Sequence, residues 1–351
     1  MMVDGRPVLN LCSNDYLGLA AAPELKAAAR AAIDAFGVGV GGARSISGTQ
    51  RLHLELEARL ASFKGCDAAM LLSSGFLANL AVVPALVDRA DVVYSDELNH
   101  ASIVDACRLC GAEIVRYPHA NVDALRELLA NSNSTGQRLV VTDGVFSMDG
   151  DLAPLDRVAQ ISSASKAMLV VDDAHGAGVI GSHGRGIVDH FGVREAVTAE
   201  IGTLSKAFGV VGGYVCGPAA VIDRLRRQAR PYLFSTGLPP ADTAAALAAV
   251  DELVASDARV RRLWDNTRVF RAAVARLGLE VLGETPIVPI VLGEEAHAQE
   301  VAQRLFEAGV FVVPIAHPMV PRGRARIRVM VSATHTPADL EFAAEALGAA
   351  L

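Results

Sequence analysis

The chain has 351 residues, 52% of them hydrophobic and 20% charged, a composition that excludes intrinsic disorder and suits about two globular domains. Its formal net charge is −7 and its basic residues form no long stripe, which argues against a nucleic-acid-binding protein. Five cysteines are too few for a disulfide framework, and the first residues lack the order of a signal peptide. We therefore expect a cytoplasmic protein with no membrane partner.

Short apolar runs recur along the first two thirds of the chain, with helix-patterned stretches between them. The strand-like runs cover residues 68–72, 91–94, 112–117, 138–142, 167–171, 199–203 and 213–216, and helices are expected over residues 122–130 and 155–163. Continuous apolar strands that alternate with helices predict an α/β fold whose sheet is mostly parallel and covered on both faces. Ligands bind at the carboxyl ends of such strands, so functional residues are expected directly after each run.

After Pro239 and Pro240 the pattern changes to that of a smaller α+β domain. One Ala-rich helix is expected over 241–277, followed by strands over 287–292, 310–314 and 326–332, with helices over 296–308 and from residue 337. The opening strand and turn over 8–19 has no obvious place in the large sheet. We therefore divide the chain into an N-terminal segment (1–36) that packs with the small domain, a large cofactor-binding domain (37–240) and a small C-terminal domain (241–351).

Two short motifs have a context that does not favour the site they suggest. Residues 37–42 match G-x-G-x-x-G, but a helical stretch precedes them instead of a strand, so we expect a loop beside a ligand or a partner chain, not a dinucleotide site. Cys107 and Cys110 form a C-x-x-C with no second pair at zinc-finger spacing, so we interpret them as small apolar side chains on a helix.

Charged side chains follow two of the predicted strands. One run leads into Asp172, Asp173 and His175, which suit a metal site, a helix cap beside a hydrogen-bonded histidine, or an acid that pairs with a protonated ring nitrogen. Lys206 lies just past the strand over 199–203, where partial desolvation favours the neutral amine and a Schiff base. The alternative for this lysine is a surface position at the start of a helix. Neither segment decides the chemistry by itself.

Taken together, the strand ends predict a site for pyridoxal 5′-phosphate. That cofactor needs a lysine for its aldehyde, a carboxylate for its ring nitrogen and hydrogen-bond donors for its phosphate. Lys206 and Asp172 supply the first two, and the turn over 73–76, which opens a helix, offers backbone N–H groups for the phosphate. His100 and Ser147 also follow predicted strands, and the imidazole of His100 is placed to stack on the cofactor ring.

Motifs along nearly the whole chain resemble those of the α-oxoamine synthases, a family of pyridoxal-phosphate enzymes. In chain order they are SNDYLGL (13–19), GGARSISGT (41–49), SSGF (73–76), LNHASI (98–103), TDGVFSMDGD (142–151), VDDAHGAGVIGSHGRG (171–186), TLSKAFG (203–209), RPYLFST (230–236) and RARIRVMVSATHT (324–336). The resemblance implies the aspartate-aminotransferase-like fold (fold type I), with a seven-stranded, mostly parallel sheet and a smaller C-terminal domain. It also implies a homodimer with shared active sites.

The resemblance assigns roles to the matching residues around the cofactor. Lys206 is implied to form the Schiff base and to move the substrate Cα proton, and Asp172 to bond the ring nitrogen. His100 is implied to stack on the ring and to orient the acyl thioester. The other cofactor-binding residues it implies are His175 (also catalytic) and Ser147 on the phenolic oxygen side, Gly75, Phe76 and Thr203 near the phosphate, and Ser235 and Thr236 reaching the phosphate of the partner subunit.

The same resemblance implies how substrates bind and what the reaction is. Arg328 clamps the amino-acid carboxylate, with Asn14 close by. The amino acid condenses with an acyl-CoA to give an α-amino ketone, and CoA leaves, together with carbon dioxide when the substrate carboxylate is lost. No metal takes part.

The substrate pair stays open. The SNDYLGL opening favours L-alanine with a pimeloyl thioester of CoA or acyl carrier protein, as in biotin biosynthesis. The RARIRVMVSATHT ending favours glycine with acetyl-CoA. Met319 in the expected substrate site lacks the hydrogen-bond donor of a threonine, which argues against the pimeloyl thioester. More distant alternatives are glycine with succinyl-CoA, serine with a fatty acyl-CoA, and a non-catalytic relative.

Overall fold

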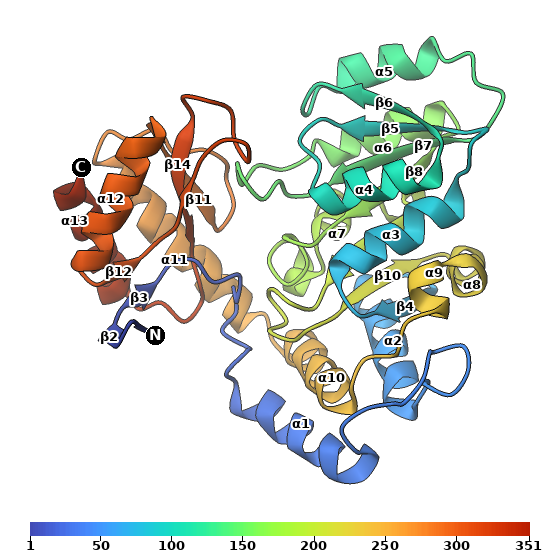
Figure 1. Cartoon of the computed structure of the whole chain (residues 1–351), viewed down its shortest axis with the longest axis horizontal. Helices are drawn as coiled ribbons and strands as arrows, with labels where there is room; N and C mark the ends of the chain where they lie inside the picture. The colour runs from blue at the N-terminus through green and yellow to red at the C-terminus, as the bar shows by residue number, and fades with distance from the viewer. The chain divides into compact units, whose positions relative to one another are not determined.

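The apolar runs predicted as strands form one seven-stranded sheet in the computed structural model, which describes residues 1–351 (Figure 1). From one edge to the other, the strands are β4 (Ala68–Leu72), β10 (Gly213–Gly217), β9 (Ala199–Thr203), β8 (Met168–Asp172), β7 (Arg138–Asp143), β5 (Val92–Asp96) and β6 (Glu113–Tyr117). Only β10 runs against its neighbours, while the other pairs are parallel. The prediction of a mostly parallel α/β sheet is therefore confirmed.

The chain divides into two compact units. The sheet unit comprises Leu19–Val145 and Ala153–Asp257, and the terminal unit comprises Met1–Gly18, Phe146–Leu152 and Ala258–Leu351. The sheet unit contains the helices α1 (Pro23–Phe36), α2 (Arg51–Lys64), α3 (Gly75–Leu86), α4 (Ala101–Cys110), α5 (Val122–Ala130), α6 (Leu155–Ala164), α7 (Ile187–Phe191), α8 (Ala219–Gln228), α9 (Arg230–Leu233) and α10 (Pro240–Ala255), and the 3₁₀ turns η1 (Ser182–Gly184) and η2 (Arg194–Ala196). Parallel strands with apolar residues on both sides need such helices, which leave the middle strands fully buried.

The terminal unit is an α+β structure. Its strands are β1 (Met2–Val3), β2 (Arg6–Pro7), β3 (Leu9–Asn10), β11 (Ile287–Gly293), β12 (Val310–Phe311), β13 (Pro314–Ile315) and β14 (Ala325–Met330), and its helices are α11 (Ala258–Ala275), α12 (Glu295–Glu307) and α13 (Pro337–Ala350). β14 lies between β11 and β13, and the opening segment contributes β3, which pairs with β12. The prediction of a separate α+β pattern after the large sheet thus holds for these elements.

The helix expected over 241–277 is wrong, because the chain breaks there into α10 and α11. Ser256 adopts an extended backbone and ends α10, and the alanine-rich pattern gives way after it to the arginine-rich sequence of α11. Pro240 occupies the first turn of α10, where its fixed φ suits a helix start, so the Pro239–Pro240 pair begins a helix of the sheet unit. The α1 helix packs against α10, and the units accordingly divide after residues 18 and 257, not after 36 and 240.

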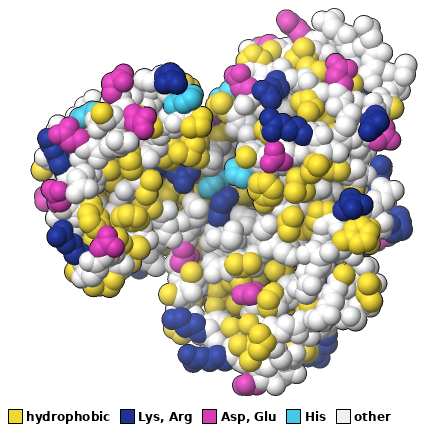
Figure 2. All heavy atoms as spheres, in the orientation of Figure 1, with side chains coloured by type: hydrophobic (Ala, Val, Ile, Leu, Met, Phe, Trp, Pro, Cys, Tyr) yellow, Lys and Arg dark blue, Asp and Glu magenta, His cyan; other side chains and the backbone are white.

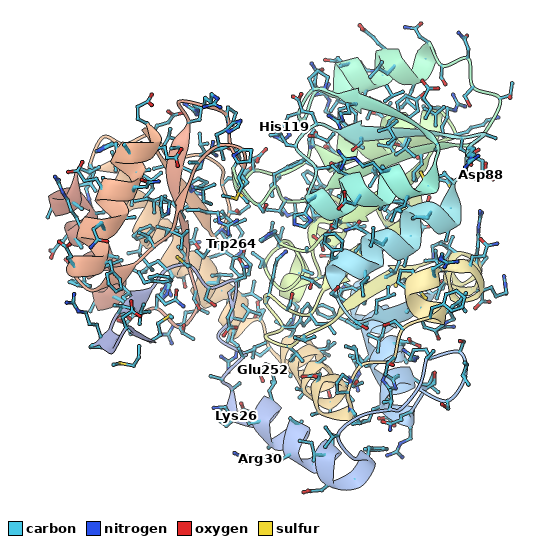
Figure 3. The ribbon with its side chains drawn as sticks, viewed as in Figure 1. Lys26, Arg30, Asp88, His119, Glu252 and Trp264 are labelled. Carbon is cyan, nitrogen blue, oxygen red and sulfur yellow. The ribbon has the colours of Figure 1, made fainter.

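One face of the molecule shows how the charged side chains are distributed. On the face drawn in Figure 2, basic and acidic side chains are scattered among hydrophobic ones, and neither sign forms a stripe. Lys26 and Arg30 on α1 and Glu252 on α10 illustrate this mixture within the sheet unit (Figure 3). None of the helices is both long and apolar enough to cross a membrane.

Candidate active site

Two buried carboxylates lie at the carboxyl ends of neighbouring strands in the sheet unit. Asp143 ends β7 and Asp172 ends β8, and the two residues are register partners. Burial, together with the negative charge of Asp172, raises the pKa of Asp143 well above its ordinary value. Two close carboxylates do not both ionise readily, and the raised pKa of Asp143 reflects that repulsion.

Hydrogen bonds hold the Asp172 carboxylate from two directions. Asn79 of α3 donates its Nδ2 hydrogen to Oδ2 at 2.6 Å, and the Ala174 N–H donates to Oδ1 at 3.0 Å. The same Asn79 amide lies 3.0 Å from the Ser102 hydroxyl on α4. Asn79 was not predicted as a site residue, although it is the only amide side chain in the apolar α3 segment.

His100 is the N-cap residue of α4 and is hydrogen-bonded to one of these carboxylates. Its backbone N–H donates to Asp143 Oδ2 at 2.7 Å, and its Nδ1 accepts the Ser102 N–H at 3.2 Å. The His100 side chain is exposed, yet the surrounding protein still desolvates the ring and lowers its pKa. The charge of Asp172 opposes this shift and that of Lys206 reinforces it, so both residues interact electrostatically with His100.

Lys206 lies in a tight loop after β9. The Gly209 N–H donates to the Lys206 carbonyl at 2.9 Å, and Gly209 has φ of +70°, a conformation that favours glycine. The Lys206 side chain is half-buried, and His175 is buried in the same unit. The predicted position of the lysine just past a strand is therefore confirmed.

The start of α3 offers backbone donors beside Thr203. Ser74 caps the helix by accepting the Leu77 N–H, which leaves the N–H groups of Gly75 and Phe76 without partners inside the helix. A Cβ on Gly75 would come within 3.0 Å of the Thr203 side chain, so the two segments approach closely. The Thr203 hydroxyl bonds the Ser205 hydroxyl at 2.7 Å and donates to the Gly212 carbonyl at 3.0 Å.

Ser235 and Thr236 lie near the same helix start. The Ser73 hydroxyl donates to the Thr236 carbonyl at 3.4 Å, and Thr236 forms an isolated bridge with Ala43. Ser73, Ser235 and Thr236 line one small pocket together with the buried Arg44. Hydroxyl groups and a helix start therefore gather at one place in the sheet unit.

The remaining predicted residues belong to the terminal unit. Arg328 on β14 donates through Nη1 to the Ser147 carbonyl at 2.9 Å, so Ser147 meets this arginine through its backbone. Burial lowers the pKa of Arg328, whereas nearby Tyr16 and Cys12 oppose that shift. The Asn14 Oδ1 atom is buried without a hydrogen-bond partner, while Met319 is exposed.

The three interpretations of the Asp172 segment can now be compared. Asp172 turns towards Asn79, whereas Asp173 meets Lys64, so the two carboxylates do not converge on one ligand. No group of three His, Cys, Asp or Glu side chains in the chain is arranged to hold a metal ion. A fixed carboxylate, an amine and free N–H groups are the donor set that suits a pyridinium nitrogen, an aldehyde and a phosphate.

Known proteins of one kind match this chain over nearly its whole length. The family model for aminotransferase class I and II matches residues 6–347. An 8-amino-7-oxononanoate synthase from Thermosipho melanesiensis is 52% identical over 98% of this chain and 88% of its own length. A solved structure of SPT with a PLP internal aldimine has a TM-score of 0.96 at 32% identity, over 99% of this chain and 88% of that one. The crystal structure of 8-amino-7-oxononanoate synthase from Francisella tularensis has a TM-score of 0.84 at 30% identity, with 97% of both chains covered.

Proposed function

The chain belongs to the class I and II aminotransferases and, within them, to the α-oxoamine synthases, and we propose on this basis that it acts as an 8-amino-7-oxononanoate synthase. In this reaction the carbonyl carbon of a pimeloyl thioester is joined to Cα of L-alanine. The thiol of CoA or acyl carrier protein leaves, and the alanine carboxylate leaves as carbon dioxide. The observation that carries the proposal is the 52% identity of this chain, over 98% of its length, to a synthase of this name. The electrostatic interaction of His100 with both Asp172 and Lys206 supports it.

The donor set fits pyridoxal 5′-phosphate, which when bound supplies an aldehyde for amines and a ring that withdraws electrons from the attached carbon. Asp172 would bond the ring nitrogen, and Lys206 would hold the aldehyde carbon. The N–H groups of Gly75 and Phe76 and the Thr203 hydroxyl would bind the phosphate. His175 and Ser147 would hold the phenolic oxygen side. We further propose a homodimer in which Ser235 and Thr236 serve the phosphate of the partner subunit.

The chain's own groups perform the proton transfers. The Lys206 amine accepts the proton from the substrate Cα and returns one to the product. Asn79 and the Ala174 N–H keep Asp172 in one place, so that its charge faces the ring nitrogen. Because His100 Nδ1 accepts from Ser102, its hydrogen lies on Nε2, which donates to the thioester carbonyl as negative charge develops there.

The substrate carboxylate is assigned to Arg328. Its Nη1 already bonds the Ser147 carbonyl, which orients the guanidinium and leaves its other N–H groups for a bidentate contact. The buried Asn14 amide oxygen, which lacks a partner, suits the substrate ammonium or an N–H group. Met319 favours a second candidate function, glycine C-acetyltransferase, because an exposed thioether donates no hydrogen bond to a long acyl chain's terminal carboxylate.

A thiol-release assay with the purified protein tests the proposal. Alanine, glycine and serine are each combined with acetyl-, succinyl-, pimeloyl- and palmitoyl-CoA, and free CoA is measured. We expect the highest kcat/KM for alanine with pimeloyl-CoA. A higher value for glycine with acetyl-CoA establishes the second candidate instead. No release from any pair, with pimeloyl-acyl carrier protein also tested as the donor for alanine, contradicts both.

A further inference from the structure

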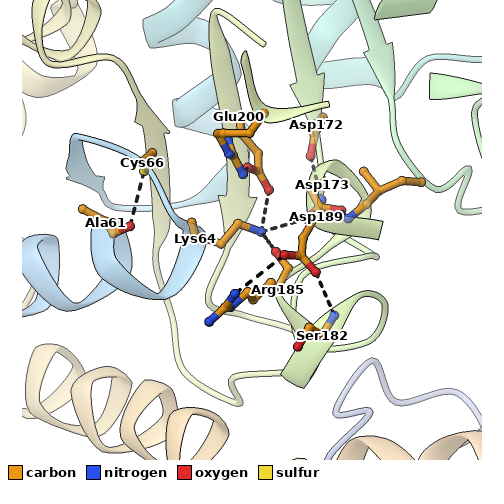
Figure 4. A network of polar contacts seen from close by, with 12 residues as sticks. Ala61, Lys64, Cys66, Asp172, Asp173, Ser182, Arg185, Asp189 and Glu200 are labelled. Carbon is orange, nitrogen blue, oxygen red and sulfur yellow. Dashed lines mark hydrogen bonds and ion pairs between the residues drawn. The ribbon is translucent and has the colours of Figure 1, made fainter. Parts of the chain in front are cut away.

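A network of ion pairs with a buried centre lies directly after the end of β8 (Figure 4). Lys64, the last residue of α2, places its Nζ 3.0 Å from Asp173 Oδ2 and 2.5 Å from Glu200 Oε1. The same Nζ donates to the Arg185 carbonyl, and the second oxygen of Glu200 pairs with Arg194. All three of the central side chains, Lys64, Asp173 and Glu200, are excluded from solvent.

The network joins segments that surround the end of β8. Asp173 also accepts the Ile187 N–H at 3.1 Å through Oδ1, and its own N–H donates to the Ile201 carbonyl of β9 at 2.8 Å. Asp173 is therefore fixed to α2, to β9 and to the start of α7. Since Asp172 is the preceding residue and Ile201 is its register partner, the same contacts fix the backbone that carries Asp172.

The glycines of the segment 171–186 fit around this carboxylate. A Cβ on Gly176 would overlap Asp173 Oδ1, and a Cβ on Gly186 would overlap both Asp173 Oδ2 and Lys64 Nζ. Gly186 has φ of +104°, which also disfavours other residues. The glycine spacing in the motif VDDAHGAGVIGSHGRG is thus explained at these two positions by the buried ion pair.

Fold stability alone gives no reason for such a network. Buried ion pairs are often no more stabilising than apolar side chains of similar volume, because charges lose their hydration. Burial lowers the pKa of Lys64, but the carboxylates of Glu200 and Asp173 outweigh that effect and raise it well above its ordinary value. The ammonium therefore keeps its charge inside the protein.

We propose that Lys64 is a positioning residue for the reaction: by fixing Asp173 and Glu200, it sets where the Asp172 carboxylate meets the cofactor ring nitrogen. This inference rests on the proposed function. Lys64 touches no reacting atom, and it acts through Asp173 and the peptide that links Asp173 to Asp172. A small displacement of a catalytic group is enough to slow a reaction on the order of 100-fold.

The variant Lys64→Met/Asp173→Asn tests this role, because it removes the ammonium and the carboxyl group that it contacts and leaves the Glu200–Arg194 pair intact. Val250→Ala, which truncates a fully buried side chain of α10, is the matched destabilised control. Lys26→Met, at an exposed lysine of α1, is the control for loss of a lysine. Each protein is measured for thermal midpoint, cofactor affinity, visible absorbance of the bound cofactor, and kcat and KM.

We expect the double variant to lose on the order of 100-fold in kcat, with an altered balance of cofactor absorbance bands and weaker cofactor binding. The KM for the amino acid should stay within about twofold, because the terminal unit's Arg328 is untouched. If the double variant does not fold, Asp173→Asn, which keeps Lys64 and Glu200, should show the same changes to a smaller extent. Spectra, affinity and kcat equal to those of Val250→Ala in whichever variant folds would overturn the proposal.

The same measurements separate this inference from the proposed function. If the wild-type protein binds pyridoxal phosphate but releases no thiol from any acyl-CoA or from pimeloyl-acyl carrier protein, the proposed function is wrong. The spectra and the cofactor affinity of the variants then still decide whether Lys64 positions Asp172. A wild-type protein that does not bind the cofactor contradicts both.

Discussion

Asn79 donates a 2.6 Å hydrogen bond to the Asp172 carboxylate, although the two residues lie 93 positions apart in the sequence. The contact joins α3, whose first turn offers N–H donors for the phosphate, to the end of β8. One helix therefore supports two parts of the proposed cofactor site.

Asn79→Ala should weaken cofactor binding by about 10- to 100-fold, because a hydrogen bond to a charged group contributes about 1.5–3 kcal/mol. Titration of the apoprotein with pyridoxal phosphate, followed by absorbance, measures this change. Asn121→Ala is the matched control, since Asn121 caps α5 by accepting the Ala124 N–H and lies elsewhere in the sheet unit. Equal affinities for Asn79→Ala and the control would contradict the assignment.

Asp143 and Asp172 should respond differently to the same substitution. Asp172→Asn removes the charge assigned to the ring nitrogen and should lower kcat on the order of 100-fold or more. Asp143→Asn keeps an oxygen that accepts the His100 N–H, and the pKa of Asp143 is already raised, so the loss should stay below about tenfold. Steady-state kinetics of the two variants measure these losses of kcat. A larger loss for Asp143→Asn than for Asp172→Asn would show that Asp143, not Asp172, faces the ring nitrogen.

Arg328→Met should raise the KM for the amino acid on the order of 100-fold and leave the absorbance of the bound cofactor unchanged. Arg324→Met is a suitable control, because Arg324 pairs with Glu280 at an exposed position of the same unit. An Arg328 variant with a normal KM would remove this residue from the substrate site.

Buried histidines should make the fold sensitive to acid. His53 accepts the Gln50 N–H at Nδ1 and bonds the Leu238 carbonyl through Nε2, so the neutral ring fits and a second proton does not. Burial lowers the pKa of His53, and His335 shows the same arrangement and the same direction. A lowered folded-state pKa means that stability is complete above about pH 6.5 and is lost as the pH falls below it, by up to about 1.4 kcal/mol per pH unit for each histidine.

Thermal midpoints between pH 7 and 5 test this effect on the wild type and on His53→Asn. The wild type should lose more stability over this range than the variant, which lacks one titrating ring. Parallel pH dependences of the two proteins would show that His53 does not contribute.

The sequence predicts the groups that follow strands but not those that meet them from elsewhere. Lys206, Asp172 and His100 could be identified because a parallel sheet brings its strand ends to one edge. Asn79 and Lys64 lie within helical patterns, and their partners are 93 and 109 residues away, so only the folded chain reveals their contacts. The break between α10 and α11 was missed for a different reason. The change there from an alanine-rich to an arginine-rich sequence, with Ser256 and Asp257 between the two, contains no glycine or proline to end a helix.

The most direct measurement of the central claim is the attachment point of the cofactor. The protein is incubated with pyridoxal phosphate, reduced with borohydride and digested, and the modified peptide is identified by mass spectrometry. Our account predicts a phosphopyridoxyl group on Lys206, and none on this peptide in Lys206→Ala. Modification of Lys26, Lys64 or Lys166 in place of Lys206, or of no lysine, would contradict it.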